Sequence, residues 1–245
     1  MILTSVFPAA ANPIDLESAD AVGRVTELYR PPRRDWLRLN LIGSVSGSAA
    51  GPDGTSESLT NSADRLILGV IRALSDVVVV GAASVRAEGY FVPRNGALAV
   101  VSRSGDFSGH NIKGSGARGT VLILCPAAAV PRARATIGLA EVTIVAVPDA
   151  HGSLTASAIV AALRGAGYRS IVAEGGPTLA TQLVLGGVVD ELCLTTSPVL
   201  NGGSLPLFGA QEFNRLPLTL DQLLVDSAGA TYARWNLYAR PTEAD

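Results

Sequence analysis

The stretch from Val172 to Leu179 combines the residue types needed to bind a phosphate and to move a proton. The apolar run Ser170–Ala173 predicts a buried strand, and Glu174 follows it directly. Two glycines and a proline come next and predict the first turn of a helix. Residues without side chains let a phosphate approach the backbone, and a helix N-terminus offers unpaired N–H groups. The stretch therefore predicts an anion site with one carboxylate beside it.

Two further strand ends have residues that suit the same kind of ligand. Gly81 and Ser84 follow the four-valine run Val77–Val80, which is typical of a strand buried on both faces. Ser102 and Arg103 follow the next such run, and a cation between hydroxyls suits a phosphate monoester such as the 2′-phosphate of NADP. The alternatives are an ordinary strand-to-helix turn and a solvated loop arginine.

Three polar residues are candidates for holding the rest of a substrate. Arg72 lies late in a predicted helix, where a cation also stabilises the helix C-terminus. Arg94 lies in a loop beside a proline and has no evident structural task. Asn40 lies on the first predicted strand of the body, and its amide both donates and accepts, as sugar hydroxyls require. A satisfied buried asparagine is the equal alternative there.

Other motifs indicate no chemistry. The GxGxxG pattern at Gly114–Gly119 precedes a strand, whereas a dinucleotide-binding loop follows one. His110 and His151 have no visible triad partner. Asp190 and Glu191 stand at the start of a predicted strand, where they read as structural caps or dimer contacts.

Composition limits the class of protein. The 245 residues are 48% hydrophobic and 16% charged, with a net charge of −2 and a pI near 5.7, so we expect a sizeable core and no nucleic-acid partner. Cys125 and Cys193 lie in apolar runs and read as small core residues. Without a cysteine or histidine cluster, no metal site is expected. Neither a secretory signal nor a transmembrane run is visible, which favours a soluble cytoplasmic protein without membrane contact.

Alternating strands and helices predict an α/β fold with a mixed, mostly parallel sheet flanked by helices and a C-terminal antiparallel hairpin. The predicted strands are Trp36–Ile42, Val77–Val80, Leu98–Val101, Val121–Cys125, Val142–Val147, Ser170–Ala173 and Glu191–Pro198, and the hairpin is Leu220–Ser227 with Thr231–Ala239. The predicted helices are Val130–Ile137, Thr155–Gly165, Pro177–Leu185 and one that Asn61 caps and that runs to about Leu74.

Residues 1–34 read as an N-terminal extension with a short helix near Leu16–Leu28, and residues 35–245 read as a single domain. The stretch Ser104–Gly119 is rich in glycine and serine, which predicts a mobile excursion between two strands.

In their order and spacing, these motifs resemble the C-terminal reductase domain of the bifunctional riboflavin-biosynthesis deaminase/reductase, which has a dihydrofolate-reductase-like fold. The deaminase half has no counterpart in this chain. The matching segments, between about Trp36 and Tyr238, are Asn40–Gly47, Leu59–Asn61, Arg72–Asp76, Val80–Glu88, Glu174–Leu179 and Val189–Leu192 through Pro198 to Gly202.

The resemblance implies NADPH-dependent reduction of the ribosylamino group of a phosphorylated pyrimidine, 5-amino-6-(5-phosphoribosylamino)uracil, to its ribitylamino form by a homodimer. The cofactor residues that it implies are Gly81, Ser84, Ser102, Arg103, Gly175, Gly176 and Thr178. The substrate residues that it implies are Asn40, Thr60, Arg72, Glu88, Arg94 and Glu174. Arg72 and Arg94 are expected to bind the 5′-phosphate, so that Arg94→Ala raises KM about tenfold.

Glu174 is the candidate catalytic residue, because a carboxylate between apolar walls holds a proton more readily than one in water. Two positions depart from the family's pattern: Ser46 stands where the family usually has Asp, and Ser84 where it usually has Thr. The missing carboxylate leaves two alternatives open. One is a pteridine or dihydrofolate reductase, and the other is a catalytically inactive NADP-binding regulatory protein.

Overall fold

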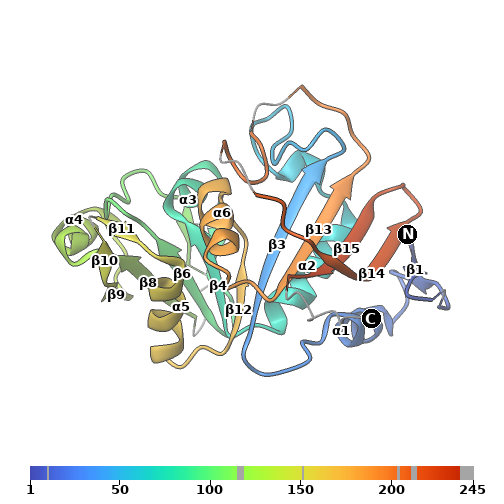
Figure 1. Ribbon diagram of the computed structural model, residues 1–245, viewed down its shortest axis with the longest axis horizontal. Helices are drawn as coiled ribbons and strands as arrows, with labels where there is room; N and C mark the ends of the chain where they lie inside the picture. The colour runs from blue at the N-terminus through green and yellow to red at the C-terminus, as the bar shows by residue number, and fades with distance from the viewer. Residues whose placement is uncertain (10, 115–118, 151, 203–204, 211–213, 238–245) are drawn as a thin grey trace. The chain divides into compact units, whose positions relative to one another are not determined.

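The computed structural model describes residues 1–9, 11–114, 119–150, 152–202, 205–210 and 214–237 (Figure 1). The contacts within the chain divide it into two compact units. The terminal unit takes residues 1–32, 37–74 and 189–245 from both ends of the chain, and the central unit comprises residues 33–36 and 75–188. Each unit has its own set of strands and helices.

The central unit is built on five parallel strands. They are β12 (Ser170–Ala173), β4 (Val77–Gly81), β6 (Ala97–Val101), β8 (Thr120–Cys125) and β9 (Val142–Ala146), in that order across the sheet (Figure 1). The β-branched residues of β4 suit a pleated surface covered on both faces, and all four of its valines are buried. Because the strands are parallel, their C-terminal ends meet at one edge of the sheet.

Helices connect these strands. α3 (Ala82–Ala87) packs on β4 and β6, α4 (Val130–Ile137) on β8 and β9, and α6 (Pro177–Leu185) on β4. α5 (Ala156–Gly165) begins after Thr155, whose hydroxyl accepts from the Ala158 N–H at 3.2 Å. The short elements of this unit are β5 (Tyr90–Phe91), β7 (Ile112–Lys113), η2 (Ala127–Ala129), β10 (Asp149–Ala150) and β11 (Ser153–Leu154).

The terminal unit joins one parallel strand pair to antiparallel strands. Across the sheet its strands are β2 (Ile14–Asp15), β1 (Ile2–Phe7), β14 (Thr219–Asp226), β15 (Thr231–Asn236), β13 (Glu191–Ser197) and β3 (Trp36–Ser44). β13 and β3 are parallel, and β14 and β15 form the C-terminal hairpin. Its helices are α1 (Ala21–Tyr29), α2 (Ser62–Ala73) and the short η1 (Glu57–Leu59). The predicted fold class, a mixed and mostly parallel sheet with helices and a C-terminal hairpin, is confirmed.

The N-terminal residues contribute a strand that the sequence did not predict. β1 pairs antiparallel with β14, with Leu3 opposite Asp226. The partner of β1 comes from the other end of the chain, so no local pattern indicates the pairing. α1 begins at Ala21 and ends at Tyr29, a few residues later than expected. The boundary at residue 34 between an extension and a domain stays a prediction.

Buried charges hold the C-terminus of α1. Glu191 is 1% exposed and pairs with Arg38 and with Arg234, whose Nε donates to Glu191 Oε1 at 2.5 Å. Arg38 also donates to the Tyr29 carbonyl oxygen at 2.9 Å, and Arg234 donates to that of Leu28. Both guanidinium groups lie over the Tyr29 ring, 5.8 and 5.3 Å from its centroid. A carboxylate and the negative end of a helix thus satisfy the buried cation of Arg38 and the partly buried cation of Arg234.

The residues on either side of Glu191 are structural as well. Asp190 Oδ2 accepts from the Leu37 N–H at 2.6 Å, at the start of β3. Cys193 is a free thiol, and burial raises its pKa to about 12. The structural roles expected for these three residues agree with these contacts.

A second buried carboxylate ties the start of α2 to the C-terminal hairpin. Asp226 Oδ2 accepts from the Tyr232 hydroxyl and from Asn61 Nδ2, both at 2.7 Å. Asn61 caps α2, as predicted, by accepting from the Asp64 N–H at 3.0 Å. Burial raises the pKa of Asp226, but the hydrogen bonds from Tyr232 and Asn61 outweigh it and hold the pKa below 3.8.

The predicted bounds of α4 and α6 match the structure, and those of α2 and α5 differ by one residue at an end. The stretch expected to be a mobile excursion contains β7, and its first part is fastened to α4 by hydrogen bonds. Residues 115–118 of the glycine motif lie outside the described residues. The same holds for His151 and for the end of the predicted hairpin beyond Leu237.

Candidate functional site

Three neighbouring strands of the central unit end at one edge of its sheet. β12, β4 and β6 are adjacent and parallel, and their register places Ala173 opposite Val79 and Gly81 opposite Val101. The residues that follow these strand ends are Glu174–Gly176 and Thr178 after β12, Gly81–Ser84 after β4, and Ser102–Arg103 after β6. The structure therefore brings the predicted cofactor residues and Glu174 to adjacent strand ends, which is where α/β sheets bind ligands.

Two glycines let the loops after β4 and β12 approach closely. The Gly81 N–H donates to the Gly175 carbonyl oxygen at 2.9 Å. Gly176 is the N-cap of α6 with φ +55°, and a Cβ there would lie 2.8 Å from Ser84 Oγ on α3. A side chain at this position would have to displace Ser84, and its backbone conformation favours glycine. The first turn of α6, with Thr178 exposed on it, thus presents N–H groups beside bare backbone and a hydroxyl.

Ser102 shapes the turn after β6. It is 4% exposed, its N–H donates to the Leu124 carbonyl oxygen at 3.0 Å, and its Oγ accepts from the Gly105 N–H at 3.0 Å. Arg103 is the next residue of this turn and is exposed. The turn therefore uses the Ser102 hydroxyl as an acceptor and presents the Arg103 cation to solvent.

Glu174 directly follows the last residue of β12. Its N–H donates to the Val79 carbonyl oxygen at 2.9 Å, which continues the pairing with β4 by one residue. Its side chain is half-buried. A carboxylate held in this way directly precedes the glycine pair, so it can act on a ligand bound at the strand ends.

The remaining predicted residues of the central unit lie elsewhere on it. Glu88 is the C-cap of α3, with its N–H donating to the Ser84 carbonyl oxygen at 2.8 Å. Arg94 is exposed and precedes the N-terminal end of β6. Beside it, the Pro93 carbonyl oxygen would lie 2.2 Å from a Cβ on Gly119, the residue before β8. The structure therefore places Arg94 near the N-terminal ends of the strands, away from the glycine pair.

Asn40, Thr60 and Arg72 belong to the terminal unit. Asn40 is half-buried in β3, with Cys193 of β13 opposite. The Thr60 hydroxyl donates to Asp64 Oδ2 at 2.6 Å, just before α2 begins. Arg72 lies in the last turn of this 12-residue helix, so about 15 Å of helix separates it from Thr60. One phosphate group therefore contacts at most one of these two residues.

Sequence reasoning noted Ser46 but missed its partner. Ser46 Oγ donates to the Asn201 carbonyl oxygen at 2.8 Å, and Asn201 Nδ2 donates to the Ala50 carbonyl oxygen at 2.7 Å. The two residues thus join the loop after β3 to the loop after β13. No pattern in the sequence indicates this pairing, because the two residues come from distant segments.

Sequence reasoning also missed the residues that fix the loop after β6. Asp106 accepts from Arg132 of α4 at 2.6 Å, and the Thr136 hydroxyl accepts from the Phe107 N–H at 3.0 Å. α4 was predicted correctly, but its contacts with this loop depend on packing that a local pattern does not contain.

In the part of the chain that the structure describes, no group of three or more His, Cys, Asp or Glu residues is arranged to hold a metal ion. Over the same residues, no helix combines the length and the apolar character needed to cross a membrane.

Comparison with solved structures shows what this arrangement is similar to. A pyrimidine reductase-like protein from Corynebacterium diphtheriae has a TM-score of 0.69 at 22% identity, over 89% of this chain and 99% of that one. A diaminohydroxyphosphoribosylaminopyrimidine deaminase/5-amino-6-(5-phosphoribosylamino)uracil reductase from Thermotoga maritima has a TM-score of 0.65 at 17% identity, over 84% of this chain and 57% of that one. The riboflavin biosynthesis reductase Rib7 of Saccharomyces cerevisiae has a TM-score of 0.62 at 14% identity, over 89% of this chain and 99% of that one.

At these identities, the structural likeness shows a shared fold. No curated protein matches the chain. The family described as RibD C-terminal domain matches residues 35–232, which is most of the chain. The chain therefore belongs to the RibD C-terminal domain family.

Proposed function

We propose that the protein is an NADPH-dependent reductase that converts 5-amino-6-(5-phosphoribosylamino)uracil to its ribitylamino form. The observation that carries this proposal is the meeting of Gly81, Gly175–Gly176 and Ser102–Arg103 on adjacent parallel strand ends. Bare backbone, a helix N-terminus and an exposed cation suit the phosphates of a dinucleotide. Family membership and the names of the similar structures support a pyrimidine reductase.

The residues at these strand ends fit the cofactor. The backbone of Gly176 lies against the Ser84 hydroxyl, since a Cβ there would be only 2.8 Å from Ser84 Oγ, and a phosphate is proposed to bind at the strand ends beside this pair. Thr178 adds a hydroxyl on the first turn of α6, and Ser102 and Arg103 are proposed to hold the 2′-phosphate. Bound NADPH supplies the hydride.

The chain's own residues are proposed to bind the substrate and to transfer a proton to it. Glu174 is proposed to protonate the ring oxygen of the opening sugar, as a general acid. Asn40 is proposed for the sugar hydroxyls, and Thr60 and Glu88 for further polar contacts. Arg72 and Arg94 are proposed for the 5′-phosphate. Arg94 lies near the N-terminal ends of the strands, away from the glycine pair, so Arg94→Ala tests this assignment. An unchanged KM in the variant would remove Arg94 from the site.

The experiment that tests the proposal is NADPH oxidation by the purified protein with two substrates in parallel. With the deaminated ribosylaminopyrimidine phosphate we expect turnover, and with dihydrofolate we expect none. Turnover of dihydrofolate alone would indicate a pteridine or dihydrofolate reductase, and NADPH binding without turnover would indicate a regulatory protein. Sedimentation of the same preparation tests the proposed homodimer.

Substitution of Gly176 tests the proposed cofactor position. Gly176→Ala places a Cβ against Ser84 Oγ, whereas Gly187→Ala, at the other end of α6, meets nothing within 4 Å. Both glycines have positive φ, +55° and +63°, so both variants lose stability through backbone strain. The loss in Gly176→Ala exceeds the roughly 1–2 kcal/mol of the left-handed region, because Gly176 has a ψ of 137° and lies outside that region. We expect NADPH affinity to fall about tenfold or more in Gly176→Ala alone. Equal affinities in the two variants would place the cofactor elsewhere.

A further inference from the structure

We propose that Arg132 is a positioning residue for cofactor choice. By neutralising Asp106, it lets the turn after β6 accept the 2′-phosphate that distinguishes NADPH from NADH. This inference rests on the proposed function and deepens it, because it identifies what controls selectivity at the same strand end.

The turn after β6 is held against α4 at several points. Gly105 has φ +66°, and a Cβ on it would lie 2.3 Å from the Ala129 carbonyl oxygen at the N-terminus of α4. The Thr136 hydroxyl donates to the Gly105 carbonyl oxygen at 3.2 Å and accepts from the Phe107 N–H at 3.0 Å. Phe107 is fully buried. The backbone on both sides of Asp106 is therefore held against α4, which fixes the point from which the Asp106 carboxylate extends.

Asp106 is charged and follows Arg103 by three residues in the same turn. Its carboxylate accepts from the Ser108 N–H at 3.0 Å and from Arg132 at 2.6 Å. The contacts with Ser108, followed by the one with Arg132, hold the pKa of Asp106 below its usual value. Three residues of chain span at most about 11 Å, so the Cα atoms of Asp106 and Arg103 lie within about one Debye length of each other.

Without Arg132, the Asp106 carboxylate would weaken phosphate binding at the site. The Asp106 Oδ atoms would then present an unpaired negative charge near the cation that is proposed to meet the 2′-phosphate. A carboxylate about 10 Å from a dianionic phosphate in water weakens binding by a few-fold. NADH has no 2′-phosphate, so its binding does not sense this repulsion. The Arg132–Asp106 pair therefore changes the affinity for NADPH relative to the affinity for NADH.

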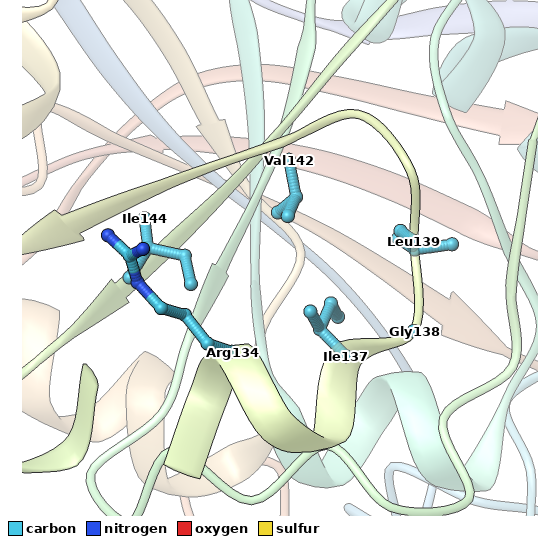
Figure 2. A pocket seen from close by; sticks show the side chains of 6 residues that line it. All are labelled: Arg134, Ile137, Gly138, Leu139, Val142 and Ile144. Carbon is cyan, nitrogen blue, oxygen red and sulfur yellow. The ribbon is translucent and has the colours of Figure 1, made fainter. Parts of the chain in front are cut away.

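The experiment measures dissociation constants of NADPH and NADH at low ionic strength for the wild-type protein, Arg132→Gln, Asp106→Asn and the double variant. The control is Arg134→Gln. Arg134 lies two residues further along α4 and so points about 200° away from Arg132. Figure 2 shows it beside a hollow of about 290 Å³ between α4 and β9, lined also by Ile137, Gly138, Leu139, Val142 and Ile144.

We expect Arg132→Gln to weaken NADPH binding about fivefold and NADH binding less than twofold. Asp106→Asn in the same chain should restore the preference for NADPH, because the unpaired charge is gone. Arg134→Gln should leave both constants unchanged. The restored preference is the readout that a purely structural role of Arg132 would not produce.

Two results would overturn the inference. One is an unchanged preference for NADPH in Arg132→Gln, and the other is a lost preference that Asp106→Asn does not restore. Each of these leaves the proposed function intact as long as the wild-type protein prefers NADPH. A wild-type protein that binds neither cofactor, or prefers NADH, would overturn the proposed cofactor and this inference together.

Discussion

Glu191 and Asp106 are both carboxylates paired with arginine, but they differ in exposure. Glu191 is 1% exposed, and its partners Arg38 and Arg234 are 3% and 13% exposed. Asp106 and Arg132 are 32% and 60% exposed. Loss of a partner in the buried cluster leaves a charge away from water, whereas water and salt screen the exposed pair. The same kind of contact therefore supports the fold in the terminal unit and adjusts the local charge in the central unit.

The largest expected effect comes from breaking the buried cluster. Glu191→Gln removes the carboxylate that pairs with the buried Arg38 and the partly buried Arg234, so we expect the free energy of unfolding to fall by about 3–5 kcal/mol. Denaturant-induced unfolding measures this loss. The control is Glu27→Gln, because Glu27 is 68% exposed and pairs with Arg30 on the surface of α1. Similar losses in the two variants would mean that burial does not decide the strength of these pairs.

An intermediate effect is expected at Asp226, which is buried but has neutral partners. Each carboxylate oxygen of Asp226 accepts from two donors: Oδ2 from the Tyr232 hydroxyl and Asn61 Nδ2, and Oδ1 from the N–H groups of Ala228 and Ala230. Asp226→Asn replaces one of these oxygens by an NH₂ group, which then faces two donors. We expect a loss of about 1–3 kcal/mol near neutral pH. A loss as large as that of Glu191→Gln would show that neutral donors matter as much as buried charges.

The pH dependence of stability gives a second test of Asp226. Its pKa in the folded protein is held below the usual range of an aspartate, so its contribution is complete above the unfolded pKa and disappears as the pH falls through the folded pKa. The difference in unfolding free energy between the wild-type protein and Asp226→Asn should therefore be constant above about pH 5 and shrink below about pH 4. A difference that grows towards acid pH would contradict the assigned direction.

The smallest effect on stability is expected at the exposed pair. Arg132→Gln and Asp106→Asn should each lower the unfolding free energy by less than about 1 kcal/mol, since solvent screens this pair. Thermal unfolding of the variants prepared for the cofactor measurements gives these values. A loss comparable to that of Glu191→Gln would assign the pair to the fold and remove the contrast between the two carboxylates.

Much of the central unit could be predicted from local patterns. The valine run of β4, the proline at the start of α6 and the hydroxyl cap of α5 are all short-range signals, and the corresponding elements lie where they were expected. The strand ends that bear Gly81, Gly175 and Ser102 could be placed at one edge because parallel strands share a direction. The order and spacing of these motifs carried the resemblance to a known family.

The roles of the candidate substrate residues stay predictions, and the sequence did not indicate how these residues lie relative to one another. Thr60 and Arg72 both looked like ligand contacts, but they lie at opposite ends of α2. Arg94 follows α3 in the chain, yet it lies near the N-terminal ends of the strands. A loop residue can lie near either edge of a sheet, and its sequence context does not say which.

The sequence by itself determined which segments are strands and helices, where α2 is capped, and which strand ends bear glycines, hydroxyls and a carboxylate. These features depend on hydrophobic periodicity and on backbone preferences within a few residues. The tertiary structure alone decided that β1 pairs with β14, that Arg38 and Arg234 share Glu191, that Gly176 lies against Ser84, and that α4 holds the loop containing Asp106. Those contacts join residues distant in the chain, and they form only when packing brings their elements together.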